Sequence, residues 1–212
     1  TLAPLLPVLR EVVSDPAQLK LVEQLAQWPG DYPLDSVSAT VFNQFLYDLA
    51  DAAMRDELGN DFFETLLSTR VIDAALPRLT ENADSPWWDN RNTPNRETRA
   101  DIVKAAWQAS MAHLKQTLGD NPSDWQWGTA HTLTHGHPLG QQKPLDRIVN
   151  VGPFAAPGSH EVPNNLSAKL GPAPWPVTYG PSTRRLVDFA DPAHSLTINP
   201  VGQSGVPFDS HY

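Results

Sequence analysis

The stretch DIVKAAWQASMAHLKQTLG (residues 101–119) decides the fold of the first half of the chain. Large apolar residues recur in it at intervals of four, four, three and four, the spacing of one face of an α-helix. Gly119 follows the last of them, and glycine commonly ends a helix. The pattern predicts a helix over about residues 95–118 whose buried face carries Val103, Trp107, Met111, Leu114 and Leu118.

Upstream of this helix, the same kind of pattern repeats with clear start and stop signals. Asp15 stands before Pro16, so we expect a capped helix there that ends at residues 28–30, Trp-Pro-Gly. Gln18 stands where a capping box would place it. The apolar stripe of this helix is predicted to be Leu19, Val22 and Ala26.

Two further helices are predicted between this helix and the long one. Asp35 or Ser36 should open the first, and Gly59 should end it. Its predicted buried face is Val41, Phe42, Phe45, Leu49 and Ala53. Asp61 with Glu64 resembles a capping box for the second, which Pro77 should interrupt because proline lacks the N–H that a helix interior needs.

Composition changes near residue 119 and sets the expected domain organisation. Residues 1–119 hold 3 of the 12 glycines and 8 of the 21 prolines, while residues 120–212 hold the rest. We therefore expect a helical region over 1–119 and a region of strands and loops over 120–212, an α+β fold. Alternating residues predict strands with one packed face at Val177 and Tyr179, at Val187 and Phe189, and at Leu196 and Ile198; residues 150–176, rich in proline, are predicted to form a long ordered loop.

Charge and composition argue against several classes of protein. The net charge of −9, without any run of Lys and Arg, argues against a protein that binds nucleic acid or anionic membranes. No stretch approaches the roughly 18 apolar residues of a membrane span. The absence of cysteine excludes disulfides, thiolate nucleophiles and cysteine-based zinc sites within this sequence.

Three histidines in HTLTHGHPLG (residues 131–140) are candidates for metal ligands. On a strand, His131, His135 and His137 would share one face. The zinc-protease pattern, however, needs a helix and a glutamate beside the first histidine, and this segment holds no carboxylate. We therefore expect structural histidines held by hydrogen bonds, and no bound metal or cofactor.

The segment DSPWWDNRN (residues 84–92) could hold Ca²⁺ through the oxygens of Asp84, Asp89, Asn90 and Asn92. It lacks the central glycine of the EF-hand loop. The simpler interpretation is an inter-helix loop that its two tryptophans fix to the core, with Asp and Asn supplying turn chemistry.

Two hydroxyl side chains, those of Thr1 and Ser204, are candidate nucleophiles. Thr1 could use its own α-amine as the base, but two prolines and a helical pattern follow it in place of a buried strand. We interpret position 1 as a boundary of cleavage or cloning. Ser204 lies in Gly-Gln-Ser-Gly, one residue short of the G-x-S-x-G turn of esterases, so a tight turn is the expected use of this stretch. No catalytic residue is predicted from local chemistry.

Four segments, taken in order, resemble the C-terminal part of the β-subunit of the penicillin acylase family. They are WPGDYPLDSVSATVFNQFLYDL (28–49), PWWDNRNTPNRETRADIVKAAWQASMAHL (86–114), WQWGTAHTLTHGHPLG (125–140) and VTYGPSTRRLVDFADPAHSLTINPVGQSGVPFDSHY (177–212). The most specific parts are W-x-W-G-x-x-H from Trp125 to His131, His137-Pro138-Leu139, and the Gly-Gln-Ser-Gly that precedes Ser-His-Tyr. One departure is Pro157 to Asn164, where the family often has PGDGDTVN.

The resemblance implies a partial N-terminal-nucleophile hydrolase, an αββα fold. In that family a serine at the start of the β-subunit attacks an amide carbonyl, its α-amine relays the proton through water, and backbone N–H and Asn donors stabilise the oxyanion. Nothing in this sequence matches the Ser-Asn-x-Trp start of that subunit, so none of the family's catalytic residues is carried over. Family members are bacterial and periplasmic or extracellular, which the resemblance extends to the parent protein as an expectation.

Two function classes remain at this point. The first is a non-catalytic fragment of an acylase that cleaves N-acylated β-lactams or N-acyl homoserine lactones, with the α-subunit and the rest of the β-subunit as its partners. The second is a stand-alone binding module with a cleft lined by aromatic and His side chains. If the chain is a fragment, its late strands should leave an open edge through which it could self-associate, and its end, including Phe208 and Tyr212, should be weakly anchored.

Overall fold

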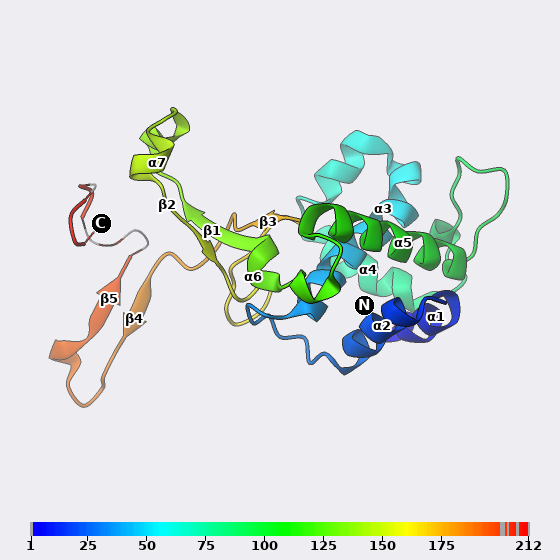
Figure 1. Ribbon diagram of the computed structural model, residues 1–212, viewed down its shortest axis with the longest axis horizontal. Coiled ribbons are helices and arrows are strands. Elements are labelled where there is room, and N and C mark those ends of the chain that lie inside the picture. Colours follow the sequence, from blue (N-terminus) through cyan, green and yellow to red (C-terminus); the bar gives the residue numbers. More distant parts are fainter. Residues whose placement is uncertain (1, 200–201, 203, 207, 212) are drawn as a thin grey trace. The chain divides into compact units, whose positions relative to one another are not determined.

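The computed structural model describes residues 2–199, 202, 204–206 and 208–211, and these form two compact units (Figure 1). The helical unit runs to Ala130 and also includes Lys169–Trp175. The strand unit comprises His131–Ala168 and the chain from Pro176 onward. The α+β class predicted from the sequence is confirmed, because helices are followed by a few short strands.

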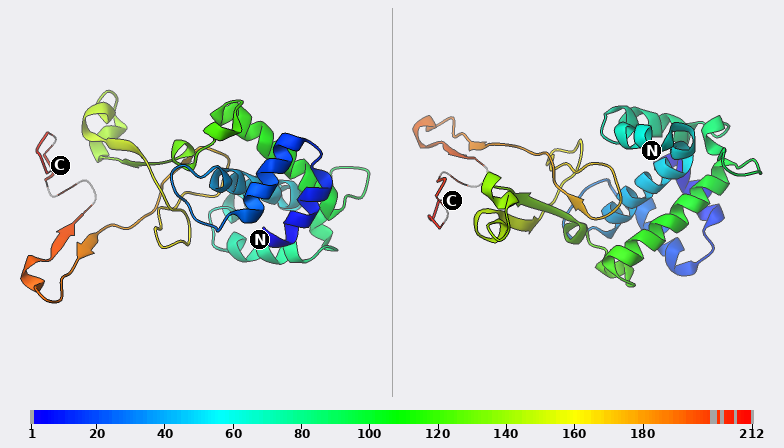
Figure 2. Two further views of the ribbon diagram at one scale, coloured as in Figure 1. Left: turned by 60° about the horizontal axis from the view of Figure 1, so that its bottom comes forward. Right: turned by 90° about the horizontal axis from the view of Figure 1, so that it is seen from above.

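The helical unit contains α1 (Leu6–Val12), α2 (Pro16–Gln27), α3 (Val37–Leu66), α4 (Val71–Glu81), α5 (Arg99–Leu118) and the single turn α6 (Trp127–Ala130). Short 3₁₀ turns, η1 (Ala3–Leu5), η2 (Pro86–Trp88) and η3 (Pro122–Asp124), lie between them. Figure 2 shows α3 and α5 side by side, with α1 and α2 packed alongside. Among the described residues, no helix is both long and apolar enough to span a bilayer.

The core of this unit is the contact between α3 and α5. Phe45 from α3 meets Trp107 from α5 edge to face, with ring centroids 5.7 Å apart. Trp107 is 1% exposed, and its indole N–H donates to Gln18 Oε1 of α2 at 2.9 Å. One aromatic side chain thus joins three helices. The rest of the predicted face of α5 is buried as far as Leu114, and that of α3 is buried at Val41, Leu49 and Ala53.

Two predicted helix caps are confirmed, but the predicted capping box of Asp61 and Glu64 is wrong, because both residues lie within α3. The Asp15 carboxylate accepts hydrogen bonds from the backbone N–H groups of Ala17 and Gln18, and Ser36 rather than Asp35 caps α3. α5 begins at Arg99, later than predicted, because Thr98 and Asp101 form a reciprocal capping box. The buried residues of α2 are Leu21, Val22 and Leu25, so its stripe is rotated from the predicted one.

The prediction that Pro77 interrupts a helix is wrong. α4 runs through Pro77 to Glu81, and the break falls earlier, in the turn of residues 67–70 between α3 and α4. Pro77 is the seventh of the eleven residues of α4, so it removes one hydrogen bond from the interior of the helix, which nevertheless continues to Glu81. The predicted stop at Gly59 is real as a kink: its φ of 71° lies in the left-handed region, and the helix resumes directly after it.

Residues 169–175 return to the helical unit late in the chain and close its core. The indole of Trp175 stacks on that of Trp127, with centroids 5.3 Å apart, and both side chains are buried. The N–H of Ala173 donates to the buried Oε1 of Gln44 on α3 at 2.9 Å. The helical unit is therefore built from two separate stretches of sequence.

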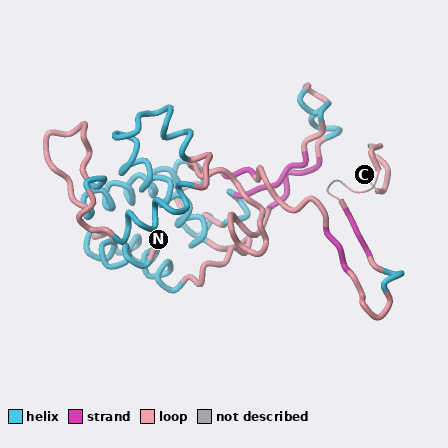
Figure 3. The backbone as a smooth tube through the Cα atoms, turned by 180° about the vertical axis from the view of Figure 1, so that it is seen from behind, coloured by secondary structure: helices cyan, strands magenta, loops and turns pink. Residues whose placement is uncertain are grey.

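A three-stranded sheet has the order β2 (Val151–Ala155), β1 (His131–His135) and β3 (Trp175–Pro176). β1 and β2 belong to the strand unit, and β3 begins with the last residue of the helical unit. β1 and β2 are antiparallel, with Leu133 opposite Phe154 and a bulge between Leu133 and His135. The prediction of a loop over residues 150–176 is therefore wrong in part, because β2 forms within this range although it contains Pro153. β2 is an edge strand, where a residue without an N–H can be accommodated (Figure 3).

A second sheet is the hairpin of β4 (Arg184–Leu186) and β5 (Leu196–Ile198), in which Arg185 lies opposite Thr197. The predicted packed face is wrong, because the apolar residues of the hairpin are exposed, Phe189 at 91%. Val187 and Phe189 lie beyond β4, in the connection that also holds η5 (Pro192–His194). Within the described residues no third strand pairs with either edge of this sheet.

Because Trp107 joins three helices in the core, Trp107→Ala should lower the free energy of unfolding by about 3–5 kcal/mol. Urea denaturation followed by circular dichroism at 222 nm measures this change. Phe189→Ala removes a large aromatic group from an exposed position and should change the stability by less than about 0.5 kcal/mol. Equal effects of the two substitutions would contradict this account of the core.

Candidate functional site

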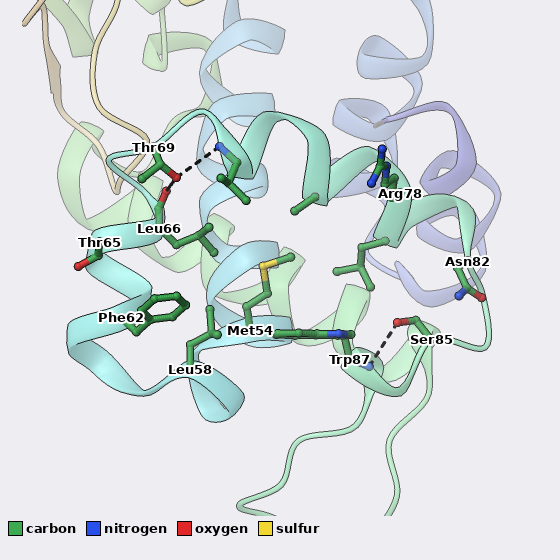
Figure 4. A pocket seen from close by; sticks show the side chains of 13 residues that line it. Met54, Leu58, Phe62, Thr65, Leu66, Thr69, Arg78, Asn82, Ser85 and Trp87 are labelled. Atoms are coloured by element: carbon green, nitrogen blue, oxygen red, sulfur yellow. Dashed lines mark hydrogen bonds between the residues drawn. The ribbon is translucent and has the colours of Figure 1, made fainter.

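The helical unit contains a pocket of about 650 Å³ between the C-terminal part of α3, α4 and the segment that leads into η2 (Figure 4). Met54, Leu58, Phe62 and Leu66 line it from α3, and Trp87 forms another wall. Such a volume lies within the range of roughly 300–1,000 Å³ typical of small-molecule sites. The pocket is therefore the candidate site that this chain itself supplies.

Two backbone features shape the pocket. The kink at Gly59 redirects the last turns of α3, which carry Phe62 and Leu66. The turn of residues 67–70 then reverses the chain into α4. Thr69 Oγ1 donates to the carbonyl of Leu66 and accepts from the N–H of Val71, which fixes this turn against the pocket (Figure 4).

The wall formed by Trp87 is fixed by the neighbouring tryptophan. Trp88 is buried and donates its indole N–H to the carbonyl of Asn82 at 2.8 Å. The adjacent Trp87 is 37% exposed and faces the pocket. The sequence prediction that both tryptophans fix the loop to the core is confirmed for Trp88. It overlooked the role of Trp87 as a pocket wall, as it overlooked Phe62.

The polar groups of the pocket differ between its two ends. Thr65 and Thr69 lie near Phe62, and their hydroxyls already donate to the backbone carbonyls of Asp61 and Leu66. Arg78, Asn82 and Ser85 lie on the side away from Phe62 (Figure 4). No Asp or Glu is among the lining residues.

A buried polar cluster lies between α3 and α5. Asp48 is 4% exposed, accepts from Gln44 Nε2 at 2.9 Å, and has Oδ1 2.9 Å from Nδ1 of the partly exposed His113. Burial raises the pKa of the Asp48 carboxyl above its ordinary value, and hydrogen bonds with Gln44 and His113 oppose the rise without cancelling it. A carboxylate that orients an imidazole is the geometry of a general base. None of these residues lines the pocket. The hydrogen bonds of the cluster join α3 to α5, so its role is to connect these helices.

The three candidate histidines do not come together as a metal site. His131 is fully buried, its Nδ1 lies 2.7 Å from the carbonyl oxygen of Ala156, and burial lowers the pKa of its imidazole. His137 lies outside β1, at the start of η4 (Pro138–Gln141), where its Nδ1 accepts from the N–H of Leu139. Across the described residues, no group of three or more His, Asp or Glu is placed to hold an ion.

The oxygens of residues 84–92 serve loop structure. Asp89 Oδ1 accepts from the N–H of Glu97, and Asn90 Oδ1 accepts from the N–H of Asn92. Asp84 contributes its N–H to the Asn82 side chain. The predicted turn chemistry of this segment is thus confirmed, and its acceptors are used within the loop.

The two candidate nucleophiles have different outcomes. Thr1 lies outside the described residues. Ser204 Oγ accepts from the N–H of Val206 two residues on, the local turn expected from its glycine neighbours. The predicted weak anchoring of the chain end fits Phe208, which is 89% exposed, while Tyr212 lies outside the described residues.

Comparison with known proteins assigns the chain to a family. The model of the penicillin amidase family matches residues 1–212. The chain belongs to the penicillin amidase family. Its members are N-terminal-nucleophile hydrolases, in agreement with the resemblance found in the four sequence segments.

Relatives of known name are acyl-homoserine lactone acylases called QuiP. The chain is 27% identical to the one from Pseudomonas aeruginosa over 209 residues, which cover 90% of this chain and 24% of that protein. It is 29% identical to the one from Pseudomonas putida over 188 residues, or 84% of this chain and 22% of that protein. The chain thus spans about a quarter of the length of these relatives.

Because its pKa is raised in the folded state, Asp48 makes a contribution to the free energy of unfolding that falls as the pH rises. Below the ordinary carboxyl pKa of 3.8 the group is protonated in both folded and unfolded states, and the contribution is fully present. It is lost as the pH rises through the higher pKa of the folded state. The stability of the natural chain relative to Asp48→Asn should therefore fall as the pH rises from about 4 to 7.

Urea denaturation at each pH measures this difference, in which the titration of all other groups cancels. The control is His113→Gln, which removes the imidazole and leaves Asp48 buried. The difference between His113→Gln and the double variant His113→Gln, Asp48→Asn should also fall with pH. A difference that rises with pH would mean that the carboxylate is stabilised by its partners more than burial destabilises it.

Proposed function

We propose that this chain is a supporting, non-catalytic part of an amidohydrolase that cleaves the amide bond of N-acylated small molecules, N-acyl homoserine lactones among them. The observation that carries the proposal is the family match over residues 1–212, together with relatives that are about four times as long. Proteins that share this stretch are named for their acylase activity.

The proposed chemistry requires a nucleophile from outside these 212 residues. In the proposed enzyme, the hydroxyl of an N-terminal serine attacks the amide carbonyl and its α-amine takes up the proton through water. Backbone N–H and Asn donors would stabilise the tetrahedral oxyanion. The polar groups described here, at Asp48, His131 and Ser204, are engaged in connecting helices, strands and turns. Their use within the fold supports a structural role for this part of the enzyme.

We further propose that the hairpin of β4 and β5 docks on the rest of the acylase polypeptide. Leu186, Leu196 and Ile198 are more than half exposed, and both outer edges of the hairpin lack a partner strand among the described residues. Exposed apolar residues on an open strand edge are a template for pairing with another chain. In the absence of the rest of the enzyme, the same edge favours self-association.

A binding module in its own right is the second candidate, and the pocket between α3 and α4 is the observation that favours it. Phe62 and Trp87 form aromatic walls of this pocket. No histidine is among its lining residues, so it differs from the aromatic and His-lined cleft suggested by the sequence.

The gene distinguishes these two candidates. For the acylase, the reading frame should continue several hundred codons upstream of the codon for Thr1 and should encode a Ser-Asn-x-Trp subunit start. A start codon immediately before Thr1 would favour the binding module instead. Sequencing the gene upstream of this stretch is a direct measurement of either outcome.

The purified 212-residue chain should not hydrolyse N-acyl homoserine lactones, because it lacks the serine that would supply both nucleophile and base. Release of free homoserine lactone, followed by chromatography, measures the activity. Turnover that disappears in Thr1→Ala would show that this threonine acts as the nucleophile, and the proposed non-catalytic role would be wrong.

Replacing both Leu196 and Ile198 by Lys should reduce self-association of the isolated chain without loss of folding, because both positions are exposed and charges on an edge strand oppose pairing. Sedimentation velocity at increasing concentration measures the association. Leu139→Lys, at an exposed position outside the hairpin, is the control and should leave the association unchanged. A natural chain that stays monomeric at high concentration would argue against an open edge.

A further inference from the structure

The pocket between α3 and α4 has an apolar interior that is open to solvent. Phe62 is 58% exposed, Val71 is 61% exposed and Trp87 is 37% exposed. All three lie around one hollow, together with the methyl and methylene groups of Met54 and Leu66. A hollow lined in this way fits a flexible hydrocarbon chain, because such a chain needs contact area and no hydrogen bonds.

Side-chain donors of the pocket lie on the side away from Phe62. Asn82 Oδ1 accepts from the N–H of Asp84, which leaves the Nδ2 amide of Asn82 to donate. Ser85 Oγ accepts from the N–H of Trp87, which leaves the Ser85 hydroxyl proton to donate (Figure 4). Each of these oxygens already accepts one hydrogen bond, and the amide and hydroxyl protons remain available to donate.

Arg78 gives the same end a positive charge. It is the charged residue of the lining, it is exposed, and within the described part of the chain its guanidinium forms no ion pair or hydrogen bond. Arginine binds carboxylates through two parallel N–H donors, and such charge-assisted hydrogen bonds are about twice as strong as neutral ones. The charge and the donors of this end are both complementary to an anion.

We propose that this pocket binds a medium-chain carboxylic acid, with the hydrocarbon tail between Phe62 and Trp87 and the carboxylate at Arg78, Asn82 and Ser85. The inference goes beyond the proposed function, because it concerns residues of this chain alone and requires no catalytic serine. The two proposals therefore fail or succeed separately.

Isothermal titration of the 212-residue chain with decanoate, kept below its micelle concentration, tests the proposal. We expect saturable binding of one decanoate per chain. Decanol has the same tail without the charge and should bind at least about tenfold more weakly, the factor that 1.4 kcal/mol of charge-assisted hydrogen bonding produces. Arg78→Gln should weaken decanoate binding by a similar factor and should leave decanol binding unchanged.

Two variants separate the pocket from the rest of the surface. Ala75→Phe places a ring in the apolar part of the pocket and should abolish binding of both ligands. Arg184→Gln makes the same change of charge on the exposed strand β4 and should have no effect. Circular dichroism confirms that each variant keeps its helices. Quenching of Trp87 by a bromine-labelled decanoate, lost in Trp87→Phe, locates the tail.

Three results would overturn the proposal. The first is the absence of saturable binding, or binding that Ala75→Phe and Arg78→Gln leave intact. The second is a dimer of the chain that Ala75→Phe dissociates and decanoate does not, which would make the pocket an interface between copies. The third is that decanoate binds to the 212-residue chain but not to a longer acylase polypeptide that contains this chain. That result would make the pocket a contact surface for the remainder of the polypeptide.

Discussion

The packing of α5 against α3 is the contact on which the helical unit depends. Trp107 provides its centre, because one indole ring contacts Phe45 of α3 and donates a hydrogen bond to Gln18 of α2. Polar groups reinforce the same interface a little further along, where Asp48 and Gln44 of α3 meet His113 of α5. An interface with both an aromatic centre and a hydrogen-bonded polar cluster fixes the register of the two helices more strictly than apolar contact alone. The residues of α3 that line the pocket, such as Met54 and Leu58, are positioned by the same register.

The sequence was sufficient to predict those elements whose limits depend on local chemistry. Asp15 caps its helix as predicted, because a cap is formed by side chains within three residues of the backbone groups that they satisfy. The capping box of Thr98 and Asp101 has the same local character, but it was not predicted. The sequence did not predict β2, since its Pro153 argues against a strand unless the strand is known to lie at an edge. Edge position is a property of the assembled sheet and has no local signal.

The same distinction separates the site residues that were predicted from those that were missed. The loop role of Asp89 and Asn90 follows from their neighbours in sequence, and the structure confirms it. The pocket brings Phe62, Arg78 and Trp87 together from three elements, and no spacing in the sequence relates them. A usable signal was the pair of adjacent tryptophans, because if Trp88 enters the core, its neighbour must face elsewhere. A partly exposed indole that lines the same hollow as an exposed Phe62 indicates a ligand surface or an interface.

The return of Lys169–Trp175 to the helical unit has a consequence for how the protein is made. A ribosome synthesises α1 to α6 first, but Gln44 and Trp127 acquire their partners Ala173 and Trp175 more than forty residues after α6 has been made. Until then Oε1 of Gln44 lacks the N–H of Ala173, and the face of the Trp127 indole that stacks on Trp175 is uncovered. Closing the intervening loop costs chain entropy that grows slowly with the length of the loop. The nascent helices therefore emerge as an incomplete body, and their native packing is completed only after β1 and β2 have also left the exit tunnel.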